Sequence, residues 1–390
     1  MGQRVDPIFF ALLRSAICGA ALTEAEKADF SAEQLGGLLA VAKTHDVAHL
    51  LAYALKQNGL IAEENAEIEA KLFNAVYRYE GLSYEYAQAC AALEAAEIPF
   101  IPLKGSVLRK YYPEEWLRTS CDVDILVHRE DLERAVSYLS KNLGYTEGER
   151  GVYDIALISP SGVHIELHFD LIGEWHAQNA TAVLSGVWDN VTLRENCRYH
   201  YEMSDAFFYF YHVAHMAKHF ENGGCGIRSF IDLWILDRLE GVDREARDRL
   251  LSEGGLLRFA DTSRALSRAW FDGEAPDALT LQMQSFIMNG GVYGSSDNRV
   301  ALWQKKKGGR VGYVLSRVFI PFARLKCYYP ILEKHPWLMP AMQVRRWFML
   351  FKPDVAKMAR AELAANRTMS QKKADKMATF LDDVVLGQRQ

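Results

Sequence analysis

The chain has 390 residues, with 45 Lys and Arg against 50 Asp and Glu and a formal net charge of −5. Its hydrophobic fraction of 49% and charged fraction of 24% are those of a folded globular protein. Intrinsic disorder, collagen-like repetition and a disulfide scaffold are thereby excluded. The length is sufficient for about two or three domains and a sizeable core.

Neither the cysteines nor the apolar runs point to an exported protein. The six cysteines are scattered and form no CxxC spacing, so neither a zinc ribbon nor a disulfide framework is indicated. The first apolar run, Ile8 to Leu13, is too short for a signal peptide and is followed by Arg14. No run approaches the roughly eighteen apolar residues of a membrane span. We therefore expect a soluble, cytoplasmic protein with reduced thiols.

Helical periodicity dominates residues 1–96. Apolar residues recur at helical spacing through 38–55, and Thr23 followed by Glu26 predicts a capping box at a helix start. A long helix is expected over 67–96, after the stop signal Asn58-Gly59. These residues are predicted to form a helical N-terminal segment.

Between residues 97 and 200 the pattern changes to alternating strands and helices. A proline-interrupted apolar run favours an edge strand, and a Pro-Ser-Gly turn joins the last two strand-like runs. The predicted elements, in chain order, are a strand over 98–103, a helix over 107–112, a strand over 122–127, a helix from 132 that Gly144 ends, and strands over 153–159 and 163–167. This part is predicted to be a small α/β core.

Residues 201–390 are predicted to be helical again, with helices over 207–220 and 228–239 around a glycine-rich loop. Within them, residues 299–352 carry about a dozen Lys and Arg against Glu333 alone, including the run Lys305-Lys306-Lys307. Aromatic residues are interleaved with these charges. Such a stretch can bind RNA, lie on an anionic membrane surface, form a groove for an acidic acceptor, or simply be the basic outer face of packed helices.

The residues most indicative of chemistry are three carboxylates. Asp122 and Asp124 lie two apart on a predicted strand, so their side chains project to the same face. Two adjacent carboxylates repel, and a divalent cation such as Mg²⁺ is the usual way to hold both ionised. Glu166 places a third acid between apolar residues of another strand, with Asp170 as the substitute. The alternative for Glu166 is an edge-strand acid paired with His164 or His168. Gly105-Ser106 sits where a strand turns into a helix, so its amides and hydroxyl could hold phosphate oxygens.

Taken together, the Gly-Ser turn, the Asp-x-Asp strand and the later acid resemble the nucleotidyltransferase superfamily typified by DNA polymerase beta. More narrowly, the sequence resembles an uncharacterised bacterial nucleotidyltransferase-like family over roughly residues 30–240. The segments that carry this narrower resemblance are Pro102-Leu103-Lys104-Gly105, Tyr112-Pro113, Arg118, Asp122 to Val127, Ile165 to His168, Lys218-His219, Arg228 and Asp232, with weaker similarity at Pro336-Trp337-Leu338. The gap between Gly-Ser and Asp-x-Asp is slightly longer than is usual.

The resemblance implies roles for single residues. Asp122 and Asp124 would ligate two Mg²⁺ ions, and Glu166 would complete the second metal site and help deprotonate the acceptor. Ser106, with Gly105 and the amides around it, would hold the β- and γ-phosphates of an NTP.

Basic residues near these acids are the other candidates for the nucleotide site. Lys104 and Arg118 flank the carboxylates, and Lys218 and His219 are candidate phosphate contacts. Arg228 and Asp232 are four apart on one helix, so an intrahelical ion pair is the alternative to a role in the site.

The histidines of the chain offer weaker signals. His212, His215 and His219 share one helical face, yet no cysteine or carboxylate stands beside them at a matching spacing. We therefore expect His212 to be a core residue, and His45-Asp46 to be a weak indication of a hydrolase.

The sequence thus predicts an α+β protein, a small mixed-sheet nucleotidyltransferase core flanked by helical segments at 1–96 and 201–390. The expected reaction is Mg²⁺-dependent transfer of a nucleoside monophosphate from an NTP to an acceptor hydroxyl. The acceptor is a small molecule, a protein or RNA. Two alternatives remain, a toxin-like tRNA-modifying enzyme and a catalytically silent nucleotide-binding protein of the same fold.

Overall fold

The computed structural model describes residues 6–62, 64–171, 177–292, 294–329 and 331–384. It is a mixed α+β structure, 65% helical, with a five-stranded mixed sheet and a separate two-stranded sheet. The fold class predicted from the sequence is therefore confirmed. Among the described helices, none is both long and apolar enough to cross a membrane.

The five-stranded sheet has the strand order β1-β2-β5-β4-β3. β2 and β5 are parallel, whereas the other neighbouring pairs are antiparallel. The strands span Phe100–Pro102 (β1), Asp122–Val127 (β2), Thr146–Arg150 (β3), Asp154–Ile158 (β4) and His164–His168 (β5). β6 (Val191–Leu193) and β7 (Tyr201–Met203) form the second sheet. The proline-bearing strand β1 lies at an edge, as predicted, because proline cannot donate to a second neighbour.

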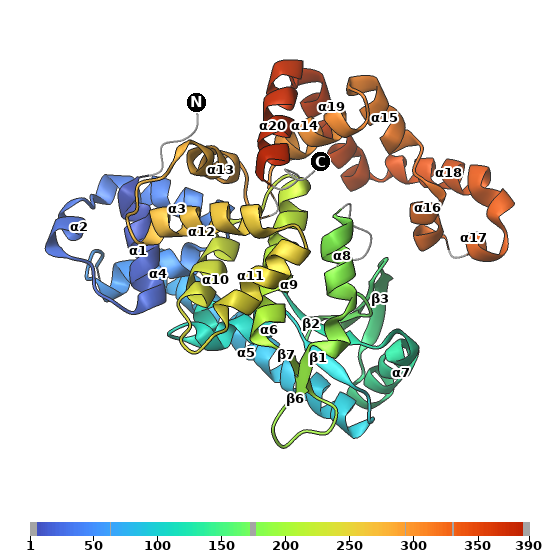
Figure 1. Ribbon diagram of the computed structural model, residues 1–390, viewed down its shortest axis with the longest axis horizontal. Coiled ribbons are helices and arrows are strands. Elements are labelled where there is room, and N and C mark those ends of the chain that lie inside the picture. The colour runs from blue at the N-terminus through green and yellow to red at the C-terminus, as the bar shows by residue number, and fades with distance from the viewer. Residues whose placement is uncertain (1–5, 63, 172–176, 293, 330, 385–390) are drawn as a thin grey trace.

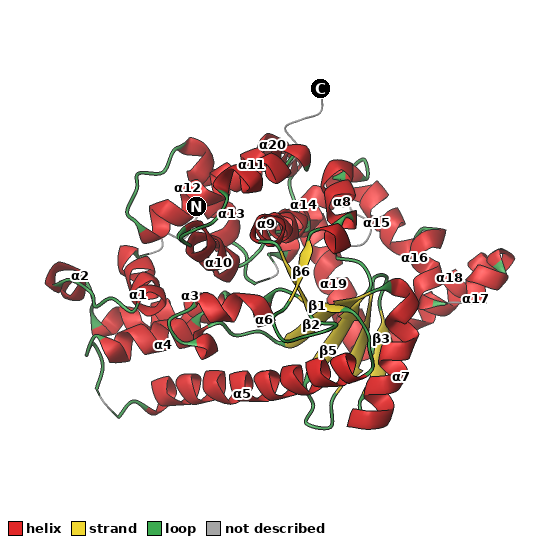
Figure 2. Cartoon of the chain, turned by 60° about the horizontal axis from the view of Figure 1, so that its bottom comes forward, coloured by secondary structure: helices red, strands yellow, loops and turns green. Residues whose placement is uncertain are grey.

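The two faces of the larger sheet have different chemistry. Because side chains alternate along a strand, Val123, Ile125 and Val127 point to one face, where they pack with Ile165 and Leu167. The helices α5 (Ala66–Ala95) and α7 (Leu132–Leu143) cover this apolar face, and Figure 2 shows α5 running along it. The opposite face carries the polar residues of the same strands and lies toward α9 (Asp205–Glu221).

The N-terminal helices lie beside the sheet and do not form a separate core. They span Pro7–Cys18 (α1), Glu24–Ala28 (α2), Leu35–Thr44 (α3) and Ala48–Gln57 (α4). The capping box predicted at the start of α2 is present, with Thr23 and Glu26 bonded reciprocally. α1 packs on α12, and the apolar residues of α1, α3 and α4 belong to one cluster with those of the later helices.

The helices that follow the five-stranded sheet in the chain complete this cluster. They span Gln178–Ser185 (α8), Asp205–Glu221 (α9), Ile227–Asp237 (α10), Arg244–Glu253 (α11), Leu257–Phe271 (α12) and Ala278–Met288 (α13). Figure 1 shows α9 and α10 between the N-terminal helices and the sheet. The division into domains at residues 96 and 200 stays a prediction.

Among the last helices, α14 and α20 add residues to the cluster described above, whereas α15 to α18 extend away from the rest of the molecule (Figure 1). They span Ser296–Lys306 (α14), Arg310–Val318 (α15), Phe322–Tyr328 (α16), Ile331–Lys334 (α17), Met339–Phe348 (α18), Pro353–Thr368 (α19) and Gln371–Val384 (α20). We call residues 310–351, from α15 through the turn after α18, the arm. The side chains of Lys305 and Lys306, in the predicted basic run, lie outside the described residues.

Candidate active site

The three predicted carboxylates meet on the polar face of the sheet. β2 and β5 are adjacent and parallel, and their register places Asp124 directly beside Glu166 and Asp122 beside His164. Asp122 and Asp124 share this face because they lie two residues apart on β2. Two segments separated by about 40 residues of chain are therefore joined into a single acidic site.

Asp124 is at the centre of this site and is buried, with 3% of its surface exposed. Its Oδ1 accepts hydrogen bonds from Lys104 Nζ at 2.9 Å and from His168 Nε2 at 2.8 Å. The same His168 nitrogen lies 3.3 Å from Glu166 Oε2. Oδ2 of Asp124 accepts no hydrogen bond from the residues that the structure describes. The site therefore keeps a carboxylate oxygen available for a ligand.

The crowding of negative charge appears in the pKa values of these groups. Burial raises the pKa of Asp122 to about 6, and the charges of Asp124 and Glu166 add to the rise. Burial acts in the same direction on Asp124, but the Lys104 charge and the His168 hydrogen bond hold the pKa of Asp124 well below its ordinary value. Of these two acids, Asp122 is thus the one that lacks enough positive charge nearby to stabilise its ionised form.

The segment between β1 and β2 is shaped by two unusual backbone positions. Lys104 has φ 44° and ψ −115°, a left-handed conformation that turns the chain from β1 into α6 (Gly105–Leu108). A Cβ on Gly105 would lie 3.1 Å from Ser120 Cβ, so any larger residue would require Ser120 to move by a few tenths of an ångström. The glycine that was predicted to approach a phosphate therefore also has a packing reason to be there.

Ser106 points to a different space from the acids. It lines a cavity of about 330 Å³ together with Pro102, Arg109 and Arg194. Its hydroxyl is buried and has no hydrogen-bond partner among the described residues. Of the described acids Asp122, Asp124 and Glu166, none lines this cavity. The phosphate-binding role of Ser106 stays a prediction.

Helix α9 closes the polar face of the sheet with a row of titratable residues. Lys218 Nζ lies 4.6 Å from the centre of the Tyr153 ring, and burial together with the Lys104 charge lowers the pKa of Lys218 to about 8. Burial, Lys104 and Lys218 lower the pKa of His219 to about 4. These shifts place Lys218 and His219 close to Lys104. His212 is buried in the core and bonded to the Ser229 carbonyl at 3.1 Å, as predicted.

Arg228 and Asp232 do not pair with each other, because each has a distant partner. Arg228 Nη1 lies 2.7 Å from Asp46 Oδ2. Asp46, which the sequence singled out together with His45, therefore has a structural role as the partner of Arg228. Asp232 receives two bonds from Arg118, at 2.7 and 2.8 Å, and a third from Tyr112 at 2.7 Å. Arg118 and Asp232 are buried, so their pair fixes the segment before β2 onto α10.

The comparisons with known proteins agree with this arrangement. The model of a family described as uncharacterised nucleotidyltransferase matches residues 31–272, which include the sheet, the acidic site and helices α9 to α11. The chain belongs to this nucleotidyltransferase family. Neither the curated proteins nor the solved structures contain a match to the chain.

The nucleotidyltransferase acids fit a divalent cation. Asp124, Glu166 and His168 each offer one ligand atom, and these atoms all lie within 4.8 Å of one another. Carboxylate oxygens suit Mg²⁺, whereas the imidazole nitrogen is also compatible with softer metals such as Mn²⁺ or Zn²⁺. Among the described residues, these three side chains could hold a metal ion together, and none of the three histidines of α9 belongs to this group.

Two residues of the site were not identified from the sequence. His168 lies two positions after Glu166 on β5, so the period of the strand could have placed it on the acidic face. Tyr211 is buried on α9, its hydroxyl has no partner among the described residues, and the charges of Lys104 and Asp124 act on its pKa. No sequence signal separates Tyr211 from the aromatic residues around it.

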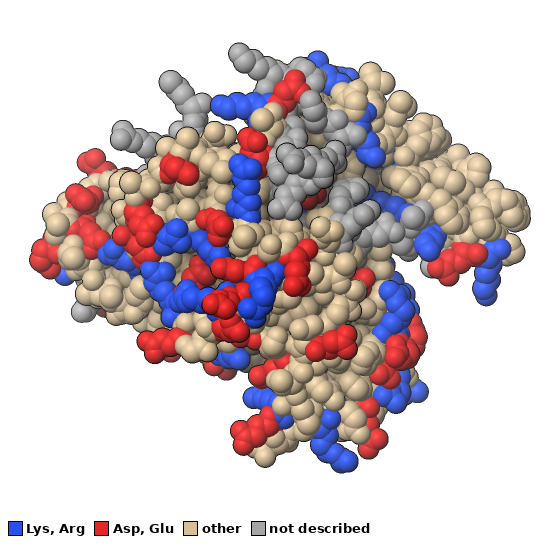
Figure 3. Space-filling model, in the orientation of Figure 1, with Lys and Arg blue, Asp and Glu red and all other residues tan. Residues whose placement is uncertain are grey.

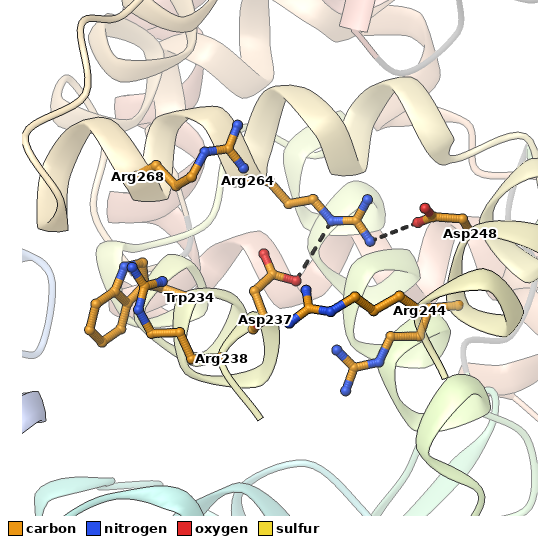
Figure 4. A pocket seen from close by; sticks show the side chains of 8 residues that line it. Trp234, Asp237, Arg238, Arg244, Asp248, Arg264 and Arg268 are labelled. Atoms are coloured by element: carbon orange, nitrogen blue, oxygen red, sulfur yellow. Dashed lines mark hydrogen bonds and ion pairs between the residues drawn. The ribbon is translucent and has the colours of Figure 1, made fainter. Parts of the chain in front are cut away.

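A second cluster of charges, on α10, α11 and α12, has a structural explanation. It surrounds a cavity of about 240 Å³ (Figure 4). Figure 4 shows Arg264 between Asp237 and Asp248. The other arginines there also have partners, since Arg238 pairs with Asp272 and Arg268 with Glu274. These ion pairs tie the three helices together.

Proposed function

We propose that this nucleotidyltransferase moves a nucleoside monophosphate from an NTP to an acceptor hydroxyl with Mg²⁺ and releases pyrophosphate. The observation that carries the proposal is the convergence of Asp122, Asp124 and Glu166 on one face of the sheet, around the buried Asp124. The raised pKa of Asp122 indicates unneutralised negative charge, which a divalent cation would compensate. The reaction is proposed to take place in the cytoplasm.

In this proposal the acids bind the metal and the basic residues bind the triphosphate. Asp122, Asp124 and Glu166 would hold two Mg²⁺ ions, which supply charge neutralisation at the phosphates and a lower pKa for the acceptor hydroxyl. Lys104 and Lys218 lie on the rim of this face and are suited to the β- and γ-phosphates.

The transfer step forms one bond and breaks one bond. The acceptor oxygen attacks the α-phosphorus, and the bond from that phosphorus to the bridging oxygen breaks, so that the electron pair leaves with pyrophosphate. The hydroxyl proton passes to a carboxylate of the site, for which Glu166 is best placed because it is partly exposed next to buried Asp124. His168 positions both acids through its Nε2.

The experiment is a transfer assay with each α-labelled NTP. Wild type and an Asp122→Asn/Asp124→Asn variant are incubated with Mg²⁺ or Mn²⁺, with and without tRNA and a cell metabolite extract. Pyrophosphate release and labelled product are measured. We expect transfer that the double variant abolishes, and the labelled species then identifies the acceptor. Absence of transfer and of metal-dependent NTP binding would contradict the proposal.

Two alternatives are separated by the same assay. Labelling of tRNA alone, with binding that weakens strongly as salt rises, would select the tRNA-modifying enzyme. NTP binding without turnover in wild type would select the silent binding protein.

A further pair of variants tests the third acid, since Glu166→Gln should abolish transfer and Asp170→Asn should retain it.

A further inference from the structure

The arm combines positive charge with exposed apolar side chains. The stretch 299–352 has about a dozen Lys and Arg and one acid, in a chain whose formal charge is −5. Among the described residues of the arm, ten large apolar side chains are exposed, including Trp337 at 74% and Phe351 at 83%. Figure 3 shows much of the arm as an uncharged surface on the face in view. An exposed apolar surface of this kind marks a site of interaction.

Part of this apolar surface is a stripe along α15. Val311 and Leu315 are four residues apart, so they lie on the same side of the helix, and Phe319 follows directly after the end of the helix. Their exposed fractions are 73%, 52% and 55%. The opposite side of α15 is packed, since Tyr313 is 1% exposed. The helix is thus amphipathic, and its outer apolar side has no cover among the described residues.

A second stripe follows α18 and joins the first. Val344, Phe348 and Phe351 are exposed by 44%, 65% and 83%, and with Trp347 they line a groove of about 350 Å³. The Trp347 ring lies 5.6 Å from that of Phe319, at the end of the α15 stripe. The two stripes therefore form one continuous apolar surface.

Beside this surface lies a cavity of about 430 Å³ that is lined by three arginines, Arg317, Arg324 and Arg346, and by one acid, Glu149 of β3, so that it is basic on balance. Arg317 is neutralised by Glu362 at 2.7 Å. Among the described residues, no carboxylate forms an ion pair with Arg324 or Arg346. Nη2 of Arg346 donates to the carbonyls of Arg317 and Val318, whereas its Nε is buried without a partner. Met349 lines the cavity and is itself exposed, so the cavity adjoins the apolar surface. It is suited to a phosphate group.

Three classes of partner differ in how well they match these features. RNA would match the charge and the aromatic rings, but it offers no apolar partner for aliphatic side chains such as Val311 and Leu315. A second copy would bring one strongly basic arm against another. A bilayer with anionic lipids offers both hydrocarbon and phosphate at the same surface.

We propose that the arm binds the surface of membranes that contain anionic lipids. The stripes on α15 and α18 enter the boundary between headgroups and acyl chains, and Arg324 and Arg346 take lipid phosphates. Among the described residues of the arm, no helix is long and apolar enough to span a bilayer, so we expect binding to be reversible and to weaken as ionic strength rises. The proposal does not depend on the acidic site, which lies on the sheet.

The test is co-sedimentation of the full-length protein with vesicles of phosphatidylcholine, with and without phosphatidylglycerol. We expect binding only with phosphatidylglycerol, and at least a tenfold loss of partitioning in Phe348→Ser/Phe351→Ser. The matched control is Phe73→Ser/Tyr77→Ser, because these two residues of α5 are 68% and 73% exposed and their rings also stack. The control should bind as wild type does.

The charge is tested with single substitutions. Arg324→Gln should weaken binding to the anionic vesicles about fivefold. Arg249→Gln on α11, which is also exposed, should leave it unchanged. The Asp122→Asn/Asp124→Asn variant should bind vesicles normally, so a failure of the proposed chemistry and a failure of this inference are distinguishable.

Three results would overturn the inference. One is equal binding to both kinds of vesicle, or to neither. Another is tRNA binding that falls in Arg324→Gln, without vesicle binding. The third is a dimer in sedimentation velocity that Phe348→Ser/Phe351→Ser dissociates, again without vesicle binding.

Discussion

Lys104 combines an uncommon backbone conformation with a central ion pair. Its φ of 44° is unfavourable for a residue with a side chain, and its ammonium lies 2.9 Å from Asp124 Oδ1. Strain of this kind is maintained only where the surrounding structure or the function requires it. Two substitutions of Lys104 distinguish the effect of its charge on activity from the effect of its backbone conformation on stability.

We predict that Lys104→Ala and Lys104→Gly lose transfer activity to the same extent, by at least tenfold, because both remove the ammonium from Asp124. Lys104→Gly should nevertheless be more stable than Lys104→Ala, by about 1 kcal/mol, because glycine adopts a positive φ freely. Initial rates and urea unfolding measure the two effects. If both variants were equally stable, the backbone at position 104 would not be strained by the presence of a side chain.

Tyr211 offers a second test at the scale of a single residue. Its hydroxyl is buried near Lys104 and Asp124 and has no partner among the described residues. Removal of an unsatisfied hydroxyl should not reduce stability. We predict that Tyr211→Phe keeps the melting temperature of wild type while kcat falls about tenfold, since the hydroxyl would bond to bound substrate. Unchanged kcat would show that Tyr211 has no part in the reaction.

The acids were predictable from the sequence, but their contacts were not. The period of a strand is local, so Asp122 and Asp124 could be assigned to one face from three consecutive residues. Lys104 is 20 positions from Asp124, and Arg118 is 114 positions from Asp232. Such pairs depend on tertiary packing, which is why the ion pair considered as the alternative for Arg228 and Asp232 is absent and each of these residues pairs elsewhere.

At the scale of elements, the Arg118–Asp232 pair connects the segment before β2 to α10. Both side chains are buried, at 8% and 1% exposure, so loss of one partner leaves a buried charge. We predict that Arg118→Met and Asp232→Leu each destabilise the fold by about 3 kcal/mol or more, and that the double variant loses less than the sum. A double-mutant cycle from urea unfolding measures this coupling. If the single variants kept wild-type stability and only raised KM for the NTP, Arg118 would be a nucleotide contact instead.

Strand β3 shows which elements the sequence could not reveal. All five residues of Thr146–Arg150 are exposed, so the strand has no buried apolar face to produce an alternating pattern. It is held at the sheet edge by backbone pairing with β4. β2 and β5, in contrast, have buried apolar residues on one face and were predicted.

At the scale of the whole molecule, one hydrophobic cluster joins helices from both ends of the chain. Residues from Ile8 of α1 to Val384 of α20 belong to it. Helical periodicity identified these helices but gave no information about which of them touch, because a buried stripe fits many partners. The start of the sheet was clearer in the sequence, since the strand pattern begins abruptly at Ile98 and the first strand begins at Phe100.

Buried histidines make the stability of this molecule dependent on pH. His45 and His200 are 1% and 4% exposed, and burial lowers the pKa of each to about 4, against an ordinary 6.5. Below pH 6.5 the unfolded chain takes up protons at these positions and the folded chain does not. Their contribution therefore lowers the free energy of unfolding as pH falls from 6.5 toward 4.

The effect of these two histidines on the free energy of unfolding can be measured separately from that of groups whose titration acts in the opposite direction. The pKa of Asp122 is raised to about 6, so this acid favours the folded state as pH falls through that value. We therefore compare wild type with His45→Gln/His200→Gln by urea unfolding at pH 7 and at pH 5. Wild type should lose about 2 kcal/mol more than the variant for each histidine removed, because the variant lacks these two imidazoles, which the folded state keeps neutral, and shares all the others with wild type. An identical loss in both proteins would mean that these two rings accept protons in the folded state, through water or local opening.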